Sequence, residues 1–496
     1  MSEVLLGIDI GTSSSKGVLA RPDGEVIASA ERAHTMSMPH PGWAEHDAED
    51  TWWGDFTGLC SELLPQADGG LAGVCTSGIG PCFLAADDAG DPLRPAILYG
   101  VDTRATREVD ELTERLGQDA VVERCGNPLT AQSVGPKMAW LRRNEPEVWE
   151  RTRLHLMAHS FVVRRLTGEY VLDHPSASMC EPLYDTGAND WIRDWAEEVA
   201  PGLALPRLLW PGEAAGEVTP DGAEATGIPA GTPVAAGTTD AWSEAVSVGI
   251  REPGDLMLMY ATTMVVWQML SESLRAPNLW STAGFYPGTH ALVAGMSTSG
   301  ALTDWVKDLV GDVDYGTLVD EAGRVEPGSH GLVVLPYFAG ERTPISDPRA
   351  RGVVAGLTMS HQRGHLYRGM LEATAYGVRH ILEAMREAGG RAERFVAVGG
   401  GTKGGLWTQI VSDVTGWPQE LPVHTIGASY GDALLAGVAA GIVEPGTSWS
   451  ARSETVEPDE ALADHYDELY GIYRDLYTAT TEQVHALADM QAGAAG

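Results

Sequence analysis

Short apolar runs separated by polar turns recur along the chain and predict a strand-rich α/β protein. Residues 4–10 are mainly apolar, residues 11–15 read Gly-Thr-Ser-Ser-Ser, and residues 16–20 return to apolar character. Apolar runs of this length bounded by glycine and hydroxyl residues are typical of strands joined by a turn. The chain therefore opens with a predicted strand, polar turn and strand.

The same order returns about 250 residues later. Residues 255–260 form an apolar run, residues 261–263 read Ala-Thr-Thr, and residues 264–267 are apolar again. The similarity lies in the pattern and not in residue identity. A repeat at this spacing indicates two similar α/β domains, each opening with a hairpin whose tip carries backbone N–H groups and hydroxyls. Two unrelated hairpins would give the same pattern.

A turn cluster marks the middle of the chain. Residues 229–233 read Pro-Ala-Gly-Thr-Pro, and residues 234–237 form a short strand of buried type that leads into Thr238, Thr239 and Asp240. A single hydrophobic core rarely grows beyond about 250–300 residues, so 496 residues predict two large domains. We place the boundary near residue 247, giving domains 1–247 and 248–496.

The second half ends in two further elements. Residues 394–398 predict a strand that runs into Gly399, Gly400 and Gly401, and apolar residues spaced by four then predict a helix. Strand, glycine loop and helix is the shape of a nucleotide site. From residue 458, a stripe of tyrosine and leucine residues predicts an amphipathic C-terminal helix packed on a domain. The stripe consists of Tyr466, Leu469, Tyr470, Tyr473, Leu476 and Tyr477.

Composition and charge narrow the class of protein. The chain has 69 acidic and 33 basic residues, a net charge of −36, and ordinary globular contents of hydrophobic (44%) and charged (21%) residues. Such an acidic balance argues against nucleic-acid and anionic-membrane partners. The five cysteines contain no Cys-x-x-Cys motif, so no disulfide framework is expected. Because no basic, apolar leader or spanning stretch is visible, we expect a cytoplasmic protein.

The first predicted turn carries groups suited to phosphate binding. Glycine lets the backbone approach an anion, and successive N–H groups, hydroxyls and a lysine can donate to phosphate oxygens. These donors are Gly11, Thr12, Ser13 and Lys16. Asp9 precedes the turn, and one carboxylate beside phosphate oxygens is enough to hold a hydrated Mg²⁺. An ordinary polar turn capped by Asp9 would have the same composition.

Asp240 is the candidate general base. A carboxylate held at a strand end can take the proton of a sugar hydroxyl as its oxygen attacks a γ-phosphoryl group. Asp240 would also serve as the N-cap of the following segment, and spacing alone favours that interpretation. Lys403, in the second glycine loop, suits a nucleotide site, although a lysine at such a place is usually an exposed loop residue.

Several enzyme classes lack their signatures here. The sequence contains no His-Glu-x-x-His, no Gly-x-x-x-x-Gly-Lys-Ser/Thr, no Gly-x-Ser-x-Gly and no Gly-x-Gly-x-x-Gly motif. His155 with His159, and His361 with His365, have helical spacing but no further ligands in a recognisable pattern. We therefore expect no zinc site.

Seven segments in order resemble the FGGY family of carbohydrate kinases. They are GIDIGTSSSK, PHPGWAEHD, LRPAILYGVDTRA, AAGTTD, PYFAGERTP, RGVVAGLTMSH and AVGGGTKGGLWTQIVSDVTG. The resemblance covers nearly the whole chain. It implies two ribonuclease-H-like domains of the actin/hexokinase type around an active-site cleft. ATP would lie mainly on the C-terminal domain, with the sugar on the N-terminal domain and Mg²⁺ between them.

The resemblance also implies residue roles. Asp9 matches the family's Mg²⁺ and phosphate aspartate, and Asp240 matches its general base. The first phosphate loop matches Gly11, Thr12, Ser13 and Lys16, the second Thr262 and Thr263, and the adenosine loop Gly399, Gly400 and Gly401. Ala261 stands where the second loop usually has glycine. Family members often dimerise, which implies a homodimer here.

Within the family, the segments at residues 39–47 and 93–98 are most similar to xylulokinases, which makes D-xylulose the first expected substrate. Xylulokinases carry a Gln-Met-His-Gly sugar loop where this chain has Ile79-Gly80-Pro81-Cys82, so Gly80 and Pro81 replace two sugar-contacting side chains. Residues 99–104 look more like branches acting on gluconate, tetritols or the autoinducer sugar. Asp102 is the candidate sugar contact there, and Arg104 is expected to brace the loop. A sugar-binding regulator without turnover is the alternative outside the enzymes.

Overall fold

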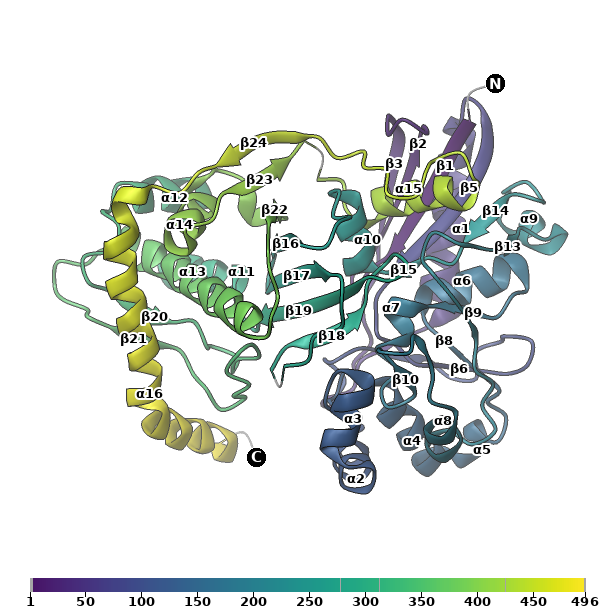
Figure 1. Cartoon of the computed structure of the whole chain (residues 1–496), viewed down its shortest axis with the longest axis horizontal. Coiled ribbons are helices and arrows are strands. Elements are labelled where there is room, and N and C mark those ends of the chain that lie inside the picture. Colours follow the sequence, from purple (N-terminus) through teal and green to yellow (C-terminus); the bar gives the residue numbers. More distant parts are fainter. Residues whose placement is uncertain (1–2, 277, 312, 424, 495–496) are drawn as a thin grey trace.

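The computed structural model describes residues 3–276, 278–311, 313–423 and 425–494 and contains two seven-stranded mixed sheets (Figure 1). The first sheet has the order β13-β14-β5-β1-β2-β3, with β15 also on β5. Its strands are β1 (Glu3–Ile10), β2 (Ser14–Ala20), β3 (Val26–Ala33), β5 (Gly70–Gly78), β13 (Ala214–Glu217), β14 (Pro233–Ala235) and β15 (Thr238–Thr239). Strands β1 and β2 form the predicted opening hairpin, and β5 lies parallel to β1.

The second sheet repeats this arrangement. Its order is β18-β19-β17-β16-β22-β23-β24, where β16 and β17 are antiparallel and β22 lies parallel to β16. The strands are β16 (Asp255–Tyr260), β17 (Met264–Leu270), β18 (Trp280–Ala283), β19 (His290–Met296), β22 (Arg394–Val398), β23 (Gln419–Pro422) and β24 (Arg452–Val456). Each sheet therefore starts with a hairpin and continues with parallel strands on one side of it, which confirms the predicted structural repeat.

Helices surround both sheets. In the N-terminal half they are α1 (Gly54–Leu63), α2 (Thr106–Leu116), α3 (Gln118–Cys125), α4 (Val134–Asn144), α5 (Pro146–Trp149), α6 (Ala158–Thr167), α7 (His174–Ala177), α8 (Arg193–Val199) and α9 (Pro220–Thr226). They are followed by α10 (Asp240–Ser247), α11 (Gly300–Leu309), α12 (Tyr315–Gly323), α13 (Arg363–Glu387), α14 (Leu406–Thr415), α15 (Ala428–Ala439) and α16 (Ala463–Ala494). The remaining strands form small two-stranded sheets: β4 (Glu45–His46), β6 (Leu84–Ala86), β7 (Ala96–Ile97), β8 (Leu154–Leu156), β9 (Val171–Asp173), β10 (Tyr184–Asp185), β11 (Asp190–Trp191), β12 (Arg207–Leu209), β20 (Val333–Leu335) and β21 (Val353–Ala355).

The predicted C-terminal helix is α16, which lies along the outside of the C-terminal half (Figure 1). Tyr466 and Tyr473 are almost fully buried and belong to the core of the second sheet. The Tyr473 hydroxyl lies 2.7 Å from that of Tyr337. The tyrosine stripe is therefore part of the core, as the spacing predicts.

Two helices fill the space between the sheets. Helix α15 contacts β1, β2, β5 and β14 of the first sheet and packs against α10, although it comes from the C-terminal half of the sequence. Figure 1 shows it, in yellow-green, beside the purple strands of the first sheet. One apolar cluster joins Leu5 and Cys75 of the first sheet, Leu434 of α15, and Met257 and Val396 of the second sheet. The two halves of the chain thus share a core.

All five cysteines are buried and unpaired, which agrees with the absence of a disulfide framework. Within the described part of the chain, no helix has both the length and the apolar character that crossing a bilayer requires.

Backbone contact between α15 and the first sheet depends on glycine. A β carbon at Gly7 in β1 would lie 2.1 Å from the carbonyl oxygen of Ser429 and 2.4 Å from the amide nitrogen of Ala433. We predict that Gly7→Ala lowers the free energy of unfolding by about 3 kcal/mol, because helix backbone must move to admit the methyl group. Urea unfolding followed by tryptophan fluorescence measures this change.

The matched control is Gly70→Ala at the start of β5 in the same sheet. A β carbon at Gly70 would meet nothing within 4 Å, so the control should leave the urea midpoint nearly unchanged. Equal midpoints for both variants would show that α15 does not contact β1 in this way.

Candidate active site

The two aspartates singled out in the sequence lie where strand ends of the first sheet meet. Asp9 is paired with Ser77 in the parallel β1–β5 ladder, and Thr239 in β15 is paired with Gly78 at the end of β5. Asp240 follows Thr239 directly and is the first residue of α10. Carboxyl ends of parallel strands are the usual place for ligand sites in α/β sheets. The fold thus brings Asp9 and Asp240 to one edge.

Both carboxyl groups are electrostatically perturbed. Burial raises the pKa of Asp9 to about 6, although a Ser77 hydrogen bond and the charges of Lys16 and His34 lower it. Burial and then the negative charge of Asp9 raise the pKa of Asp240 to about 7. Two acids that raise each other's cost of ionisation in a buried place are typical of catalytic and cation-binding sites.

Glu244 is a third acid of this site, and the sequence analysis missed it. It lies one helical turn after Asp240 on α10, and burial followed by the charge of Asp9 raises its pKa to about 7. The signal was present in the sequence, because residues i and i+4 of a helix share a face.

Asp240 is the first residue of α10 and Thr239 is its N-cap, so the interpretation of Asp240 as the N-cap is wrong. Its Oδ1 accepts a 2.7 Å hydrogen bond from the Ala241 N–H, as expected for an aspartate at a helix start. Among the described residues, no donor binds its second oxygen. The hydrogen bond from Ala241 therefore occupies one carboxylate oxygen and leaves the other available.

The tip of the first hairpin is braced from outside by residues that the sequence did not single out. His34 bridges the carbonyl oxygen of Gly11 at 3.1 Å and Asp55 Oδ2 at 2.7 Å, and the Ser15 hydroxyl donates to the same carboxylate at 2.7 Å. Burial opposes protonation of His34, but its hydrogen bond to Asp55 and the Asp55 charge outweigh it, so the His34 pKa is raised. These contacts connect the tip of the hairpin to Asp55 in α1.

The predicted loop donors face outward from this braced turn. Gly11 and Thr12 are partly exposed, and Ser13 and Lys16 are exposed. Lys16 pairs with Asp9 across the hairpin, and its Nζ lies 3.9 Å from Glu31 Oε1. The tip therefore presents polar groups next to Asp9.

A cavity of about 540 Å³ in the C-terminal half brings together four of the predicted nucleotide residues. Thr262, Gly400, Gly401 and Lys403 line it, and the sequence analysis missed its aromatic side chains, which include Tyr315, Tyr367 and Trp407.

Two other predicted residues, Thr263 and Gly399, are not part of the cavity lining. Gly399 has φ +96°, and a β carbon there would lie 2.4 Å from the carbonyl oxygen of Tyr260, which explains why glycine is needed. Gly399 therefore shapes the loop without lining the cavity.

The loop at residues 79–82 lies beside Asp240. A β carbon at Gly80 would lie 2.3 Å from Thr239 Cγ2, so no larger side chain fits there without displacing Thr239. Cys82 donates to the Ile79 carbonyl oxygen at 3.2 Å and closes the loop on itself. Gly80 and Pro81 therefore present backbone and ring atoms, but no polar side chain, near Asp240.

Asp102 is held in an ion-pair network. It is buried, and its carboxylate accepts from the Ala44 N–H at 2.7 Å and from Arg104 Nη2 at 2.6 Å. Arg104 also binds Glu45 at 2.8 Å and lies over the ring of Trp43, 3.9 Å from its centroid. Arg104 braces this loop as the sequence analysis expected, and the sugar contact of Asp102 stays a prediction.

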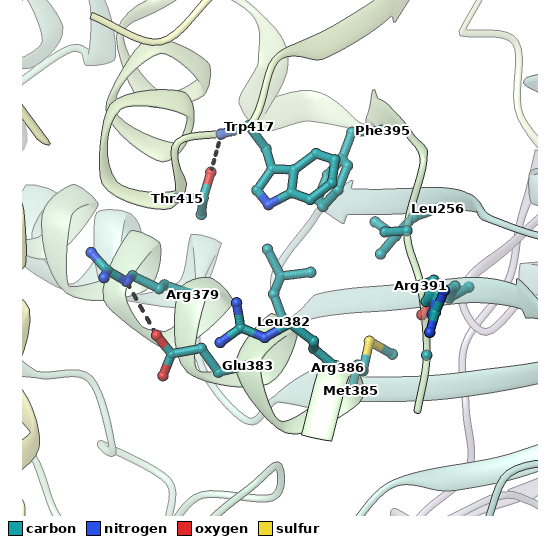
Figure 2. A pocket seen from close by; sticks show the side chains of 13 residues that line it. Leu256, Arg379, Leu382, Glu383, Met385, Arg386, Arg391, Phe395, Thr415 and Trp417 are labelled. Atoms are coloured by element: carbon teal, nitrogen blue, oxygen red, sulfur yellow. Dashed lines mark hydrogen bonds and ion pairs between the residues drawn. The ribbon is translucent and has the colours of Figure 1, made fainter. Parts of the chain in front are cut away.

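A smaller cavity of about 310 Å³ lies elsewhere, against α13 (Figure 2). Figure 2 shows Trp417 beside Phe395 above the α13 side chains Leu382 and Arg386. None of the sequence-predicted site residues lines this cavity. It is separate from the aspartate pair.

The two α/β sheets and the pair of acids at the strand ends are typical of an enzyme. Comparison with known families shows which family the chain belongs to. Residues 4–247 match the N-terminal domain and residues 256–440 the C-terminal domain of the FGGY family of carbohydrate kinases. The chain belongs to this family, is a sugar kinase, and has its actin/hexokinase-type α/β fold.

Individual relatives include xylulose kinases and a glycerol kinase. The xylulose kinase of Escherichia coli (strain K12) is 30% identical over 452 residues, covering 88% of this chain and 90% of that protein. The crystal structure of xylulose kinase from Rhodospirillum rubrum is 32% identical, has a TM-score of 0.90, and is matched over 97% of this chain and 100% of that chain. The glycerol kinase of Nocardia farcinica (strain IFM 10152) is 28% identical over 476 residues, covering 91% and 94%.

The buried acids have a measurable effect on stability. Because the Asp240 pKa is raised from 3.8 to about 7, the folded state binds this proton more tightly than the unfolded chain does. Ionising Asp240 therefore lowers the stability of the folded state. This loss of stability grows as pH rises from about 4 to 7 and is complete above 7. We predict that Asp240→Asn raises the unfolding temperature, and more at pH 8 than at pH 5.

Differential scanning calorimetry at the two pH values measures this shift. Asp88→Asn, at an exposed loop position, is the control and should change the unfolding temperature little at either pH. Destabilisation by Asp240→Asn at pH 8 would contradict the electrostatic account.

Proposed function

We propose that this protein transfers the γ-phosphoryl group of MgATP to a hydroxyl of an open-chain ketose or polyol, with D-xylulose as the first substrate. The observation that carries the proposal is the pair Asp9 and Asp240 at one strand edge, with an unbound oxygen on Asp240. We assign sugar binding and the first phosphate loop to residues 1–247 and ATP binding to residues 248–496.

Asp240 acts as the general base. Its free carboxylate oxygen accepts the proton of the sugar hydroxyl as that oxygen attacks the γ-phosphorus atom. Its pKa near 7 matches this task, because a base with a pKa near the working pH is ionised and still binds a proton well. The Ala241 N–H fixes the other oxygen and so the direction of the side chain.

Asp9 fits the position of a Mg²⁺ ligand. Its only hydrogen-bond donor among the described residues is the Ser77 hydroxyl, 3.2 Å from Oδ1, so a lone pair is available on the other oxygen. No group of three or more His, Cys, Asp or Glu residues in the described ranges forms a complete metal cage. This suits Mg²⁺, which keeps waters and phosphate oxygens as ligands. When bound, it would neutralise charge on the phosphate oxygens.

The remaining predicted residues hold the nucleotide in this proposal. Thr262, Gly400, Gly401 and Lys403 line the cavity that would take ATP, and Gly399 and Thr263 are chain neighbours of these residues. The hairpin donors Gly11, Thr12, Ser13 and Lys16 would bind phosphate oxygens beside Asp9.

The sugar is inferred from relatives and from the loop beside Asp240. Relatives about 30% identical over most of the chain are named xylulose kinases, which supports D-xylulose. Gly80 and Pro81 offer no polar side chain to a sugar, and this favours a second candidate, another ketose, tetritol, gluconate or autoinducer-type sugar. A regulator without turnover would not need both Asp9 and the free Asp240 oxygen.

The direct test is ADP release with MgATP across D- and L-ketopentoses, ketohexoses, tetritols, pentitols and sugar acids. We expect one strong responder, and we expect Asp240→Ala to lower kcat for it by about 10³-fold, because the general base is lost. Calorimetric ATP binding should be retained in this variant, and Asp88→Ala should behave like the wild type. Turnover near the wild-type rate in Asp240→Ala would refute the base assignment.

The pH dependence follows from the same carboxylate. Only ionised Asp240 can accept the hydroxyl proton, so kcat/KM for the sugar should fall as pH drops below about 7. Initial rates from about pH 5.5 to 9 at saturating MgATP measure this acid limb. A rate that stays constant down to pH 5.5 would show that no group with this pKa must be ionised.

A further inference from the structure

A fourth acid, Asp432, is buried near the strand edge that carries Asp9 and Asp240, and it has no role in the proposed reaction. It is located in α15, is fully buried, and comes from the C-terminal half of the chain. Its two oxygens bind two different elements. Oδ2 lies 2.7 Å from the Ser77 hydroxyl oxygen of β5, and Oδ1 accepts from the Ser243 hydroxyl of α10 at 2.6 Å.

The first serine leads to Asp9. Ser77 is the ladder partner of Asp9, and its hydroxyl oxygen lies 3.2 Å from Asp9 Oδ1. The Ser77 hydroxyl therefore stands between two carboxyl groups. A Ser77 hydroxyl that is held by Asp432 would restrict how the Asp9 carboxyl group can turn.

The second serine leads to Asp240. Ser243 lies three residues after Asp240, so both are in the first turns of α10. Its hydroxyl also lies 3.0 Å from the Ala428 carbonyl oxygen at the start of α15. A fixed Ser243 therefore fixes the rotation of α10 about its axis, and with it the direction of Asp240.

Helix α15 packs so closely against α10 and β1 that these contacts have no room to shift. A β carbon at Gly431 would lie 2.1 Å from the Ser243 carbonyl oxygen, and one at Gly7 would lie 2.9 Å from Asp432 Cβ. Burial and then the charge of Asp9 raise the pKa of Asp432 well above its ordinary value, whereas the serine hydrogen bonds lower it. A protonated carboxyl group would add no second negative charge beside Asp9.

We propose that Asp432 is a positioning residue for phosphoryl transfer, which holds Asp9 through Ser77 and Asp240 through Ser243 in one fixed arrangement. The inference rests on the proposed function, because it concerns the geometry of that reaction. It also means that a helix from the C-terminal half completes a site whose two aspartates come from the N-terminal half.

The test compares Asp432→Ala, Asp432→Asn and Ser243→Ala, with kcat, KM for ATP and KM for the responding sugar measured for each. Misplacing a catalytic group by about 1 Å can cost about 10²-fold, so we expect Asp432→Ala to lower kcat by about 30- to 100-fold with both KM values within about threefold. Asp432→Asn fills the same volume, can accept from one serine and donate to the other, and should recover kcat to within about fivefold of the wild type.

A double variant separates positioning from general stability. If Asp432 acts through Ser243, then Asp432→Ala with Ser243→Ala should have a kcat within about twofold of Asp432→Ala alone. Ser429→Ala is the control, since its hydroxyl is also buried in α15 but has no hydrogen-bond partner among the described residues. It should keep the wild-type kcat, and thermal unfolding should show that each variant is folded.

Three outcomes would overturn the inference: an unchanged kcat in folded Asp432→Ala, a kcat of Asp432→Asn as low as that of Asp432→Ala, or a fully multiplicative double variant. If Asp432→Ala does not fold, Ser243→Ala decides, with an expected kcat loss of about 5- to 10-fold. An unchanged kcat there would overturn the inference. Failure of the proposed function is seen separately, as a wild-type protein that responds to no sugar, and it would overturn both.

Discussion

Direct backbone contact between α15 and the first sheet is the constraint on which the rest of the structure depends. Glycines at positions 7, 73 and 431 let β1, β5 and α10 approach this helix more closely than any side chain would allow. The helix pair α10 and α15 then fills the space between the sheets with one shared apolar cluster. Because α10 begins with Asp240, packing of this helix pair also sets the position of the reactive carboxylate.

The same packing explains why four acids can be concentrated in one place. Asp9, Asp240, Glu244 and Asp432 all have raised pKa values, with burial as the largest cause. Ionising them together is unfavourable for the folded state, and the large cores of the two sheets offset that cost. The raised pKa makes Asp240 a suitable base near neutral pH. Burial is therefore the cause both of its reactivity and of its cost to the stability of the fold.

Much of this was accessible from the sequence because it depends on local patterns. Both hairpins, the strand and glycine loop at residues 394–401 and the tyrosine stripe of α16 follow from hydrophobic periodicity. Asp9 and Asp240 were found because each stands at the end of a strand. Asp432, His34 and the aromatic side chains of the cavity were missed, because their roles come from contacts between segments distant in the chain. Glu244 was missed although its i+4 spacing from Asp240 on one helix was visible in the sequence. For Asp432 the partners lie 355 and 189 residues away, and no spacing rule reaches so far.

The return of α15 to the first sheet also bears on how the polypeptide is made. During synthesis from the N-terminus, β1, β2, β5 and α10 are complete once residue 247 has emerged, but the helix that covers their glycine-lined face follows only after residues 248–427. The nascent N-terminal half therefore exposes an apolar surface until α15 has been synthesised. Chains with such an exposed surface are prone to aggregation. Expressed alone, that half would lack its cover permanently, whereas a separately supplied segment containing α15 would be its natural complement.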